Sequence, residues 1–333
     1  MKAHFAAIAA AAAAACCLSM SQTASAAVRP LDRVFIILME NQGFDNVIGH
    51  LDANNNPDTP FITHLAERYG LATLGFGVTH PSLPNYVSLI SGDYYGIQDD
   101  NPSCYAKPAP QPPCDQIDAP NIVDELEGAN ISWTALEQTM PKAGYLGVQF
   151  PKTGAPLYAQ KHNPFVYFKD IATNPARLAK ILPLPSMDAL SQALAGGRSA
   201  PRYVLIVPDQ CHDMHGQTPC SDPDRLLVQG DNYVKNLIHT INNSPAYTNN
   251  SAIFLTWDEN DFSSVLGCCD SPAIGGGHIA TIVITPRTTK PIQTATFYNH
   301  YSILSTVEQS FGLGLLGHTQ DTVNVVPLTD LLP

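Results

Sequence analysis

Oxygen and imidazole donors follow three short apolar runs of the chain. A single pair of this kind is commonly a helix cap or part of a turn. Ligands of open α/β sheets, however, bind at the carboxyl ends of the strands, so three pairs after three parallel strands would meet at one edge. Carboxylate, amide and imidazole groups gathered there are typical ligands of divalent metal ions. The donors are Glu40-Asn41, Asp213-Met214-His215 and Asp258-Glu259.

A serine in the segment 79–86 is the candidate nucleophile. The segment reads Thr-His-Pro-Ser-Leu-Pro-Asn-Tyr, and Pro84 predicts that a helix begins close to Ser82. A hydroxyl there faces free N–H groups, which can hold a phosphate, and a bound cation can activate it for attack. Asn85 could donate its amide to a phosphate oxygen, and His80 could protonate a leaving group or hold the loop. The alternative is that Ser82 only caps the helix.

Four apolar runs, continuous rather than alternating, are expected to form strands. Such runs are typical of parallel strands that are buried on both faces. They are Val34–Met39, Tyr203–Val207, Ala252–Trp257 and Ile279–Thr285. Helices are expected between them, over 121–129, 187–195, 224–241 and 301–311. This alternation predicts an α/β fold of three layers (α/β/α) with a mostly parallel central sheet, in a single domain over residues 27–333.

The N-terminus has the pattern of a secretory signal peptide. Lys2 precedes an Ala-rich apolar stretch over 5–18, and Ala24-Ser25-Ala26 is a small-residue cleavage site. Residues 1–26 are therefore expected to be removed, which predicts a secreted or periplasmic protein with no transmembrane segment in the mature chain. An Ala-rich helix of the mature fold and a lipid anchor at Cys16 are the alternatives.

Six cysteines remain after that cleavage. An even number in an exported chain favours disulfides. The spacing predicts the pairs Cys104–Cys114 and Cys211–Cys220. Cys268 and Cys269 are adjacent, so they either bond to each other or have separate partners.

The composition is that of an acidic globular protein. Hydrophobic residues make up 44% of the chain and charged residues 14%, which excludes a mainly disordered chain. The formal net charge of −12 argues against a nucleic-acid binder and against a polybasic membrane binder.

The motif Glu40-Asn41-Gln42-Gly43-Phe44-Asp45 resembles the ENxxFD signature of the bacterial phosphoesterase family. This family includes secreted acid phosphatases and phospholipases C and belongs to the alkaline-phosphatase superfamily, so the resemblance implies an alkaline-phosphatase-like fold. Further blocks follow in family order, and together they cover the chain from about residue 32 to 313. These blocks lie at 80–86, 161–165, 213–215, 256–259 and 300–302.

The resemblance also implies a role for each matching residue. Ser82 would be the phosphorylated nucleophile and one of the ligands of a divalent metal ion. The other implied metal ligands are Glu40, Asn41, Asp258 and Glu259, with Asp213, His215 and His300 as further ligands or general acids. Lys161 and His162 look like contacts to the substrate phosphate. His278 is either a phosphate or metal contact or a loop histidine with no role.

These matches predict a secreted, metal-dependent phosphomonoesterase that works through a phospho-serine intermediate. Its substrate would be a small-molecule or lipid-headgroup phosphate ester, and its metal ion Ca, Mg, Mn or Zn. Asn260-Asp261 replaces the His-Gly-Gly of the phospholipases, and their C-terminal domains are absent, which favours monoesters. The alternatives are a phospholipase C-type phosphodiesterase, a sulfatase, which the lack of an Arg after Pro84 disfavours, and an exported metal- or phosphate-binding protein without turnover.

Overall fold

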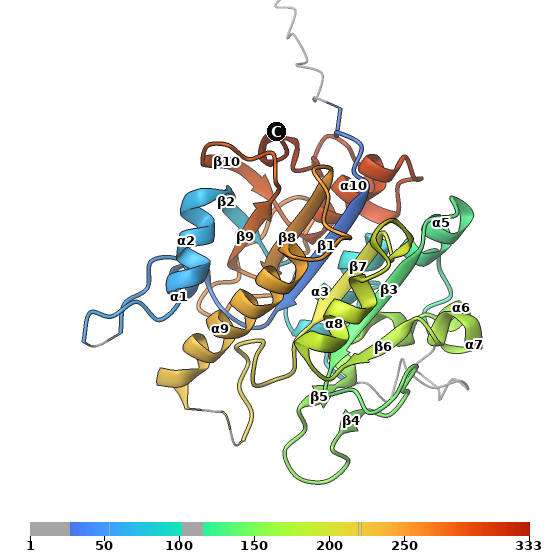
Figure 1. Ribbon diagram of the computed structural model, residues 1–333, viewed down its shortest axis with the longest axis horizontal. Coiled ribbons are helices and arrows are strands. Elements are labelled where there is room, and N and C mark those ends of the chain that lie inside the picture. The colour runs from blue at the N-terminus through green and yellow to red at the C-terminus, as the bar shows by residue number, and fades with distance from the viewer. Residues whose placement is uncertain (1–26, 53, 102–115, 219, 221) are drawn as a thin grey trace, which may run out of the picture.

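Figure 1 shows the computed structural model, which describes residues 27–52, 54–101, 116–218, 220 and 222–333. Ten strands lie within these ranges: β1 (Arg33–Met39), β2 (Gly70–Phe76), β3 (Trp133–Gln138), β4 (Gln149–Phe150), β5 (Tyr158–Ala159), β6 (Ile181–Leu184), β7 (Tyr203–Val207), β8 (Ser251–Trp257), β9 (His278–Ile284) and β10 (Ile292–Tyr298). The expected signal peptide and the expected Cys104–Cys114 pair lie outside the described residues.

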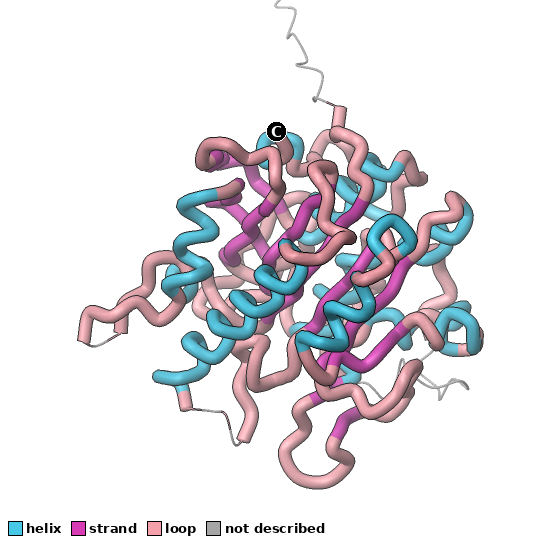
Figure 2. The backbone as a smooth tube through the Cα atoms, in the orientation of Figure 1, coloured by secondary structure: helices cyan, strands magenta, loops and turns pink. Residues whose placement is uncertain are grey.

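Helices alternate with these strands along the chain (Figure 2). The α-helices are α1 (Phe44–Val47), α2 (Pro60–Arg68), α3 (Ser82–Ser91), α5 (Ile122–Gly128), α6 (Lys169–Ala172), α7 (Pro175–Leu178), α8 (Met187–Leu194), α9 (Pro223–Asn242) and α10 (His300–Phe311). Short 3₁₀ helices are η1 (Gln160–His162), η2 (Pro164–Tyr167), η3 (Gly197–Ser199), η4 (Gly317–Gln320) and η5 (Thr329–Leu331). All four expected helices are confirmed, as α5, α8, α9 and α10.

Eight of the strands form one sheet, in the order β10-β2-β9-β8-β1-β7-β3-β6. Its central strands β8, β1, β7 and β3 are parallel to one another. Strand β9 was expected to be parallel, and this is wrong: it is antiparallel to both β2 and β8. A continuous apolar run shows that a strand is buried on both faces but carries no information about its direction.

The sheet is the middle of three layers, as predicted. The side chains of Val34, Ile36 and Leu38 in β1 pack on one side with helices α3, α5 and α10. The alternate side chains of β1 pack on the other side with helices α2, α8 and α9, the last two of which cross the front of the sheet in Figure 1. Each face therefore buries its own apolar layer, which fixes the register of the strands.

Two disulfides lie within the described residues. The expected Cys211–Cys220 bond is confirmed. Of the two alternatives for the adjacent pair, the structure has Cys268 bonded to Cys269. Within the residues described here, no helix is both long enough and apolar enough to cross a bilayer.

Helix α10 contains a buried acid, Glu308, that predicts a pH-dependent stability. Its Oε1 accepts a 2.9 Å hydrogen bond from the Leu316 N–H, while its Oε2 has no hydrogen-bond partner. Burial raises the pKa of Glu308 to about 8. The folded state thus keeps a proton that the unfolded chain releases near pH 4.5, so the free energy of unfolding falls as the pH rises toward 8.

We therefore expect Glu308→Gln to flatten the pH dependence of stability. The variant should gain stability relative to the parent between pH 5 and pH 8, by at most about 1.4 kcal/mol per pH unit. Thermal denaturation at the two pH values measures this difference. If the melting temperatures of the variant and the parent differ by the same amount at pH 5 and at pH 8, this prediction is contradicted.

Candidate active site

Strand register brings two predicted donor pairs together. Met39 lies opposite Trp257, the last residues of β1 and β8. Glu40 and Asp258 therefore leave the sheet side by side, and the Asp258 N–H donates to Met39 O at 2.9 Å. The backbone N–H of Asn41 in turn donates to Asp258 Oδ1 at 2.9 Å. The parallel strands thus supply the sheet edge that the sequence predicts.

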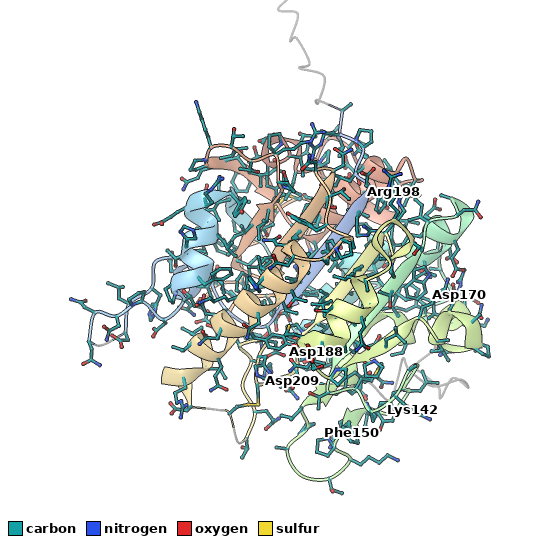
Figure 3. All side chains as sticks on the ribbon, in the orientation of Figure 1. Lys142, Phe150, Asp170, Asp188, Arg198 and Asp209 are labelled. Atoms are coloured by element: carbon teal, nitrogen blue, oxygen red, sulfur yellow. A yellow bond between two sulfur atoms is a disulfide. The ribbon has the colours of Figure 1, made fainter. Side chains whose placement is uncertain are left out.

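The third donor group reaches the same place through a loop. Strand β7 lies on the other side of β1, and the segment after it returns so that Glu40 N–H donates to Asp213 O at 2.8 Å. The Asp213 side chain accepts a 2.7 Å bond from the His215 N–H. In Figure 3, Asp209 marks this end of the sheet and Arg198 the opposite end.

Ser82 is the first residue of α3, whose ten residues are all buried. The N-cap residue is Pro81, so Ser82 does not occupy the capping position. The alternative in which Ser82 only caps the helix is therefore wrong. Its hydroxyl points away from the helix backbone, toward the residues that follow β1 and β8.

The Ser82 hydroxyl lies among three side-chain oxygens. Its Oγ is 3.1 Å from Glu40 Oε2, 3.3 Å from Glu259 Oε1 and 3.4 Å from Asn41 Oδ1. As oriented, the Asn41 amide oxygen faces carboxylate oxygens, whereas the reversed amide would donate to Glu40 and Glu259. The structure thus brings Ser82 together with Glu40, Asn41 and Glu259, beside Asp258.

A lysine approaches the same hydroxyl. Lys161 Nζ lies 3.4 Å from Ser82 Oγ and donates to Asp100 Oδ2 at 2.8 Å. Burial alone would lower the pKa of Lys161, but the charges of Glu40 and Asp100 raise it, so the amine is a cation. Lys161 was expected to contact substrate, and its position next to the nucleophile is compatible with that role.

Asp100 is a residue of the site that the sequence analysis missed. Besides holding Lys161, its Oδ1 accepts a 2.9 Å hydrogen bond from the Leu83 N–H in the first turn of α3. It therefore ties the lysine to the helix that carries Ser82. Asp100 lies in a loop with no recognisable motif, so no signal in the sequence identified it.

The His80 side chain is hydrogen-bonded to Glu259. Its Nδ1 makes a short hydrogen bond with Glu259 Oε2, and its Nε2 lies 3.2 Å from Ser264 O. Burial raises the pKa of Glu259 to about 7, although His80 acts in the opposite direction. Both ring nitrogens of His80 are engaged, so the expected leaving-group acid is corrected to a residue that holds Glu259.

His162 lies between two carboxylates, deep in the site. Its Nε2 is 3.1 Å from Glu40 Oε1 and its Nδ1 is 3.7 Å from Asp213 Oδ2. Its ring stacks on Tyr86 with centroids 5.2 Å apart. Burial lowers the pKa of His162 well below its usual value, so the ring is neutral. It is 2% exposed and Ser82 is 1% exposed, so it lies as deep as the proposed nucleophile, and its expected phosphate contact stays a prediction.

Two further predicted substrate contacts are engaged elsewhere. The Asn85 amide donates to Thr79 O at 2.6 Å and to Pro81 O at 3.1 Å, so it holds the loop that leads into α3. His278 Nε2 lies 2.9 Å from Thr73 O, and its ring stacks on Phe44. Of the two alternatives for His278, this contact favours the loop histidine, and the phosphate contact expected of Asn85 stays a prediction.

The two remaining histidines lie close to the carboxylates. His300 Nε2 is 2.9 Å from Trp257 O, its Nδ1 has no hydrogen-bond partner, and burial lowers its pKa to about 4. His215 Nδ1 lies 2.9 Å from Gly216 O, and its ring centroid is 6.1 Å from that of His162. The roles expected of His215 and His300, as metal ligands or general acids, stay predictions.

The site contains more buried negative charge than its cations balance. Glu40, Asp213, Asp258 and Glu259 each have at most 1% of their surface exposed. One oxygen on each of the first three, Glu40 Oε1, Asp213 Oδ2 and Asp258 Oδ2, has no hydrogen-bond partner. Burial and the charges of Glu40 and Glu259 raise the pKa of Asp258 well above its usual value. Unpartnered buried oxygens of this kind fit a divalent cation.

Histidine and acidic side chains alone do not complete a metal site. Among the described residues, no group of three or more His, Cys, Asp or Glu side chains could hold a metal ion. The oxygens of Ser82 and Asn41 would therefore have to take part, as the resemblance implies. The identity of the metal stays a prediction.

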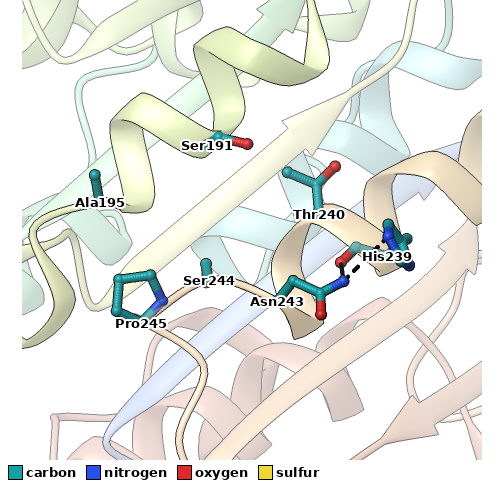
Figure 4. A pocket seen from close by; sticks show the side chains of 7 residues that line it. All are labelled: Ser191, Ala195, His239, Thr240, Asn243, Ser244 and Pro245. Carbon is teal, nitrogen blue, oxygen red and sulfur yellow. Dashed lines mark hydrogen bonds between the residues drawn. The ribbon is translucent and has the colours of Figure 1, made fainter.

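Two cavities of the described chain lie away from these residues, and a third lies next to them. One of about 490 Å³ lies between α8 and α9 and is lined by residues such as His239 and Asn243 (Figure 4). Another of about 430 Å³ lies at the opposite end of the sheet and is lined by residues such as Arg198 and Arg202. A cavity of about 390 Å³, lined in part by Thr79 and His80, lies beside the site.

Comparisons with known proteins identify the family of the chain. A family model described as the Phosphoesterase family matches residues 54–314. A probable acid phosphatase of Kluyveromyces lactis is 28% identical over 300 residues, which are 89% of this chain and 62% of that protein. A phosphatidylinositol-3-phosphatase of Mycobacterium tuberculosis is 28% identical over 308 residues, 92% of this chain and 85% of that protein. The chain spans 62% to 64% of the length of three fungal acid phosphatases that it matches.

Solved structures support the fold. An alkaline phosphatase superfamily protein of Vibrio parahaemolyticus superimposes with a TM-score of 0.57 at 10% identity, over 87% of this chain and 69% of that one. The lipoteichoic acid synthase LtaP of Listeria monocytogenes gives a TM-score of 0.57 at 12% identity, over 92% and 76%. At these identities the likeness concerns the fold alone, and it confirms the expected α/β architecture.

Proposed function

Because the chain belongs to the Phosphoesterase family, we propose that it is an exported phosphatase that hydrolyses phosphate monoesters with Ser82 as nucleophile. One observation carries the proposal: the Ser82 hydroxyl lies within 3.4 Å of Glu40, Asn41, Glu259 and Lys161. A serine that only stabilised the helix would not need to lie beside these carboxylate, amide and ammonium groups. Relatives named acid phosphatase and phosphatidylinositol-3-phosphatase support phosphate monoesters as the substrate class.

The residues around Ser82 have separate roles in its attack on phosphorus. Glu259 Oε1, at 3.3 Å, is placed to accept the Ser82 proton. His80 holds the other carboxylate oxygen of Glu259, which fixes its orientation. The Lys161 ammonium stabilises negative charge on the attacking and transferred oxygens.

The start of α3 provides a second binding element. The positive end of its dipole favours the phosphate dianion beside Ser82. In the first turn, the Leu83 N–H is bonded to Asp100 and Pro84 has no N–H. Transfer of the phosphoryl group to Ser82 Oγ would break the phosphorus–oxygen bond of the ester, and the proton that Glu259 takes from Ser82 would pass to the departing oxygen to give an alcohol. Water would then attack the phospho-serine, release inorganic phosphate and restore the serine hydroxyl. In phosphoryl transfer most of the catalysis comes from positioning and charge neutralisation.

A divalent metal ion is part of the proposal. Glu40, Asn41, Ser82 and Glu259, whose side-chain oxygens lie together, are the residues proposed to hold it. Asp213, Asp258 and His300 stay further candidates. When bound, it would supply positive charge that lowers the pKa of the serine hydroxyl and neutralises phosphate oxygens. The carboxylate oxygens without partners support this assignment, because such groups are costly to bury uncompensated.

A panel of esters tests the function. The protein, purified with its disulfides intact, should hydrolyse p-nitrophenyl phosphate and release inorganic phosphate from a phosphorylated inositol lipid. It should act on p-nitrophenyl phosphocholine at least about tenfold more slowly. Preference for the diester would instead identify the phospholipase C-type alternative. A protein that hydrolyses no ester in the panel, sulfate esters included, would be the binding protein without turnover.

We expect metal removal to abolish activity and to lower stability. After treatment with EDTA, hydrolysis should fall below about 1% of its starting rate, and one of Ca, Mg, Mn or Zn should restore it. The same ion should raise the melting temperature, because a ligand that binds only the folded state stabilises it. Differential scanning fluorimetry with each ion measures the shift.

Asp258→Asn is the matched variant for this experiment. It removes one charge from a cluster whose members repel one another. The metal-free variant should therefore melt at a higher temperature than the metal-free parent, and the ion should no longer stabilise it. Full activity of the parent in EDTA, with no ion-dependent shift, would rule out the metal.

A further inference from the structure

Large apolar side chains gather on the loop that follows the active-site acids. We call residues 262–274 the apolar loop. It contains four side chains that are exposed by more than half of their surface. They are Phe262 at 60%, Val265 at 54%, Leu266 at 64% and Ile274 at 58%. Contiguous exposure of this kind commonly marks an interaction site.

The loop presents these side chains on a backbone that is already hydrogen-bonded. Gly275 N–H donates to Val265 O at 3.0 Å, and Gly277 N–H donates to Leu266 O at 2.8 Å. The two ends of the loop approach so closely that a Cβ on Gly275 would lie 2.4 Å from Gly267 Cα. Such a loop can enter an apolar medium without leaving these main-chain groups unpaired.

A second set of contacts fixes the tip of the loop. Cys268 and Cys269 form a disulfide there, and the Asn299 side-chain amide donates to both of their carbonyl oxygens at 3.1 Å. Cys269 Sγ lies 3.4 Å from the carbonyl oxygen of Phe297, another exposed aromatic residue, at 53%. The exposed apolar side chains are therefore held outside the core by structure on both sides of them.

The apolar loop borders the active site. Phe262 stacks on His80 with ring centroids 4.2 Å apart, and His80 in turn holds Glu259. At the other end of the loop, the Thr79 hydroxyl donates to Ile274 O at 3.0 Å. The cavity of about 390 Å³ beside His80 is lined by Tyr94 and by the 272–274 segment of this loop. The apolar surface is thus continuous with the residues that lead to Ser82.

The charge on the loop argues for apolar rather than ionic attraction. Asp270 is the only charged residue of the segment, and its carboxylate lies 3.7 Å from His318 Nδ1. With no Lys or Arg, the loop cannot recognise an anionic surface by charge. Four exposed apolar side chains can instead bury their surface among the lipids of a bilayer.

We propose that the apolar loop docks on a lipid bilayer and presents Ser82 to the phosphorylated headgroups of that bilayer. The inference rests on the proposed phosphatase function and narrows its substrates to lipid monophosphates at a membrane surface. Docking comes from the loop side chains, and hydrolysis from the Ser82 site. The two can therefore be measured separately.

Sedimentation with phosphatidylcholine vesicles tests docking without any turnover. The parent protein should sediment with the vesicles, and the double variant V265S/L266S should bind at least tenfold more weakly, because two exposed apolar side chains are lost. The matched control is L51S/V323S, which removes two exposed apolar side chains outside the loop, at 49% and 83% exposure. The control should bind like the parent.

Hydrolysis assays then connect docking to the substrate. V265S/L266S should hydrolyse soluble p-nitrophenyl phosphate at the parent rate but a phosphorylated inositol lipid in phosphatidylcholine vesicles at least tenfold more slowly. Equal loss on both substrates would overturn the inference, since the substitutions would then act on the site itself.

Two other results would also overturn it. A parent that cleaves p-nitrophenyl phosphate but does not sediment with vesicles retains the proposed function and has no docking surface. A concentration-dependent dimer in gel filtration that V265S/L266S abolishes, without vesicle binding, would make the loop a protein interface.

Vesicle binding by a parent that hydrolyses no ester would contradict the phosphatase function while the docking surface stands.

Discussion

Replacing Ser82 with alanine is expected to reduce kcat for phosphate monoesters at least about 10³-fold, because it removes the hydroxyl that we propose as the nucleophile. Its Oγ is the atom on which Glu40, Glu259 and Lys161 converge. The substitution removes no helix cap, so the fold should be retained. Stopped assays of phosphate release, with circular dichroism on the same samples, measure both expectations.

The matched control for this prediction is Ser91→Ala, at the other end of the same helix. The Ser91 hydroxyl donates to Val87 O at 2.8 Å and contacts no residue of the site, so its loss should leave kcat within about twofold. Incubation of the parent with substrate, followed by acid quenching, should trap phosphate on Ser82 and not on the Ser82→Ala protein. Hydrolysis by Ser82→Ala near the parent rate would mean that another group is the nucleophile.

The central sheet and the convergence of the acids could be predicted because both follow from local pattern. The continuous apolar runs marked the central strands β1, β7 and β8, and the parallel register of β1 and β8 then forces Glu40 and Asp258 together. The sequence patterns of the outer strands predict a strand less clearly. Strand β2 has glycine at two of its seven positions, and β10 alternates between half-buried and exposed residues.

Side-chain roles were harder to predict than positions. Asn85 and His278 have the chemistry to hold phosphate, yet their hydrogen bonds go to backbone carbonyls, and only the path of the chain determines that. The depth of His162 likewise depends on the packing of Tyr86 against its ring. Asp100 was missed for the opposite reason, since its partners Lys161 and Leu83 are brought to it by folding alone.

Lys161 is the second residue whose replacement should have a large effect. We expect Lys161→Met to lower kcat about 10²- to 10³-fold, the usual cost of losing one group that stabilises charge in the transition state. The ammonium lies 3.4 Å from Ser82 Oγ, in a site where four carboxylates are buried. Steady-state kinetics on p-nitrophenyl phosphate separates the effect on kcat from that on KM.

Two variants make the lysine prediction specific. Lys169→Met removes a surface lysine that pairs with Asp118 at 2.7 Å, nearly the 2.8 Å of the Lys161–Asp100 pair, and it should leave kcat unchanged. Asp100→Asn keeps an oxygen for the Leu83 N–H but weakens the hold on Lys161, so its loss of kcat should be smaller than that of Lys161→Met. If Lys161→Met raises KM at constant kcat, the ammonium binds the ester equally in ground and transition states. Lys161 would then be a substrate-binding residue only, and Asp100 would position it for binding and not for catalysis.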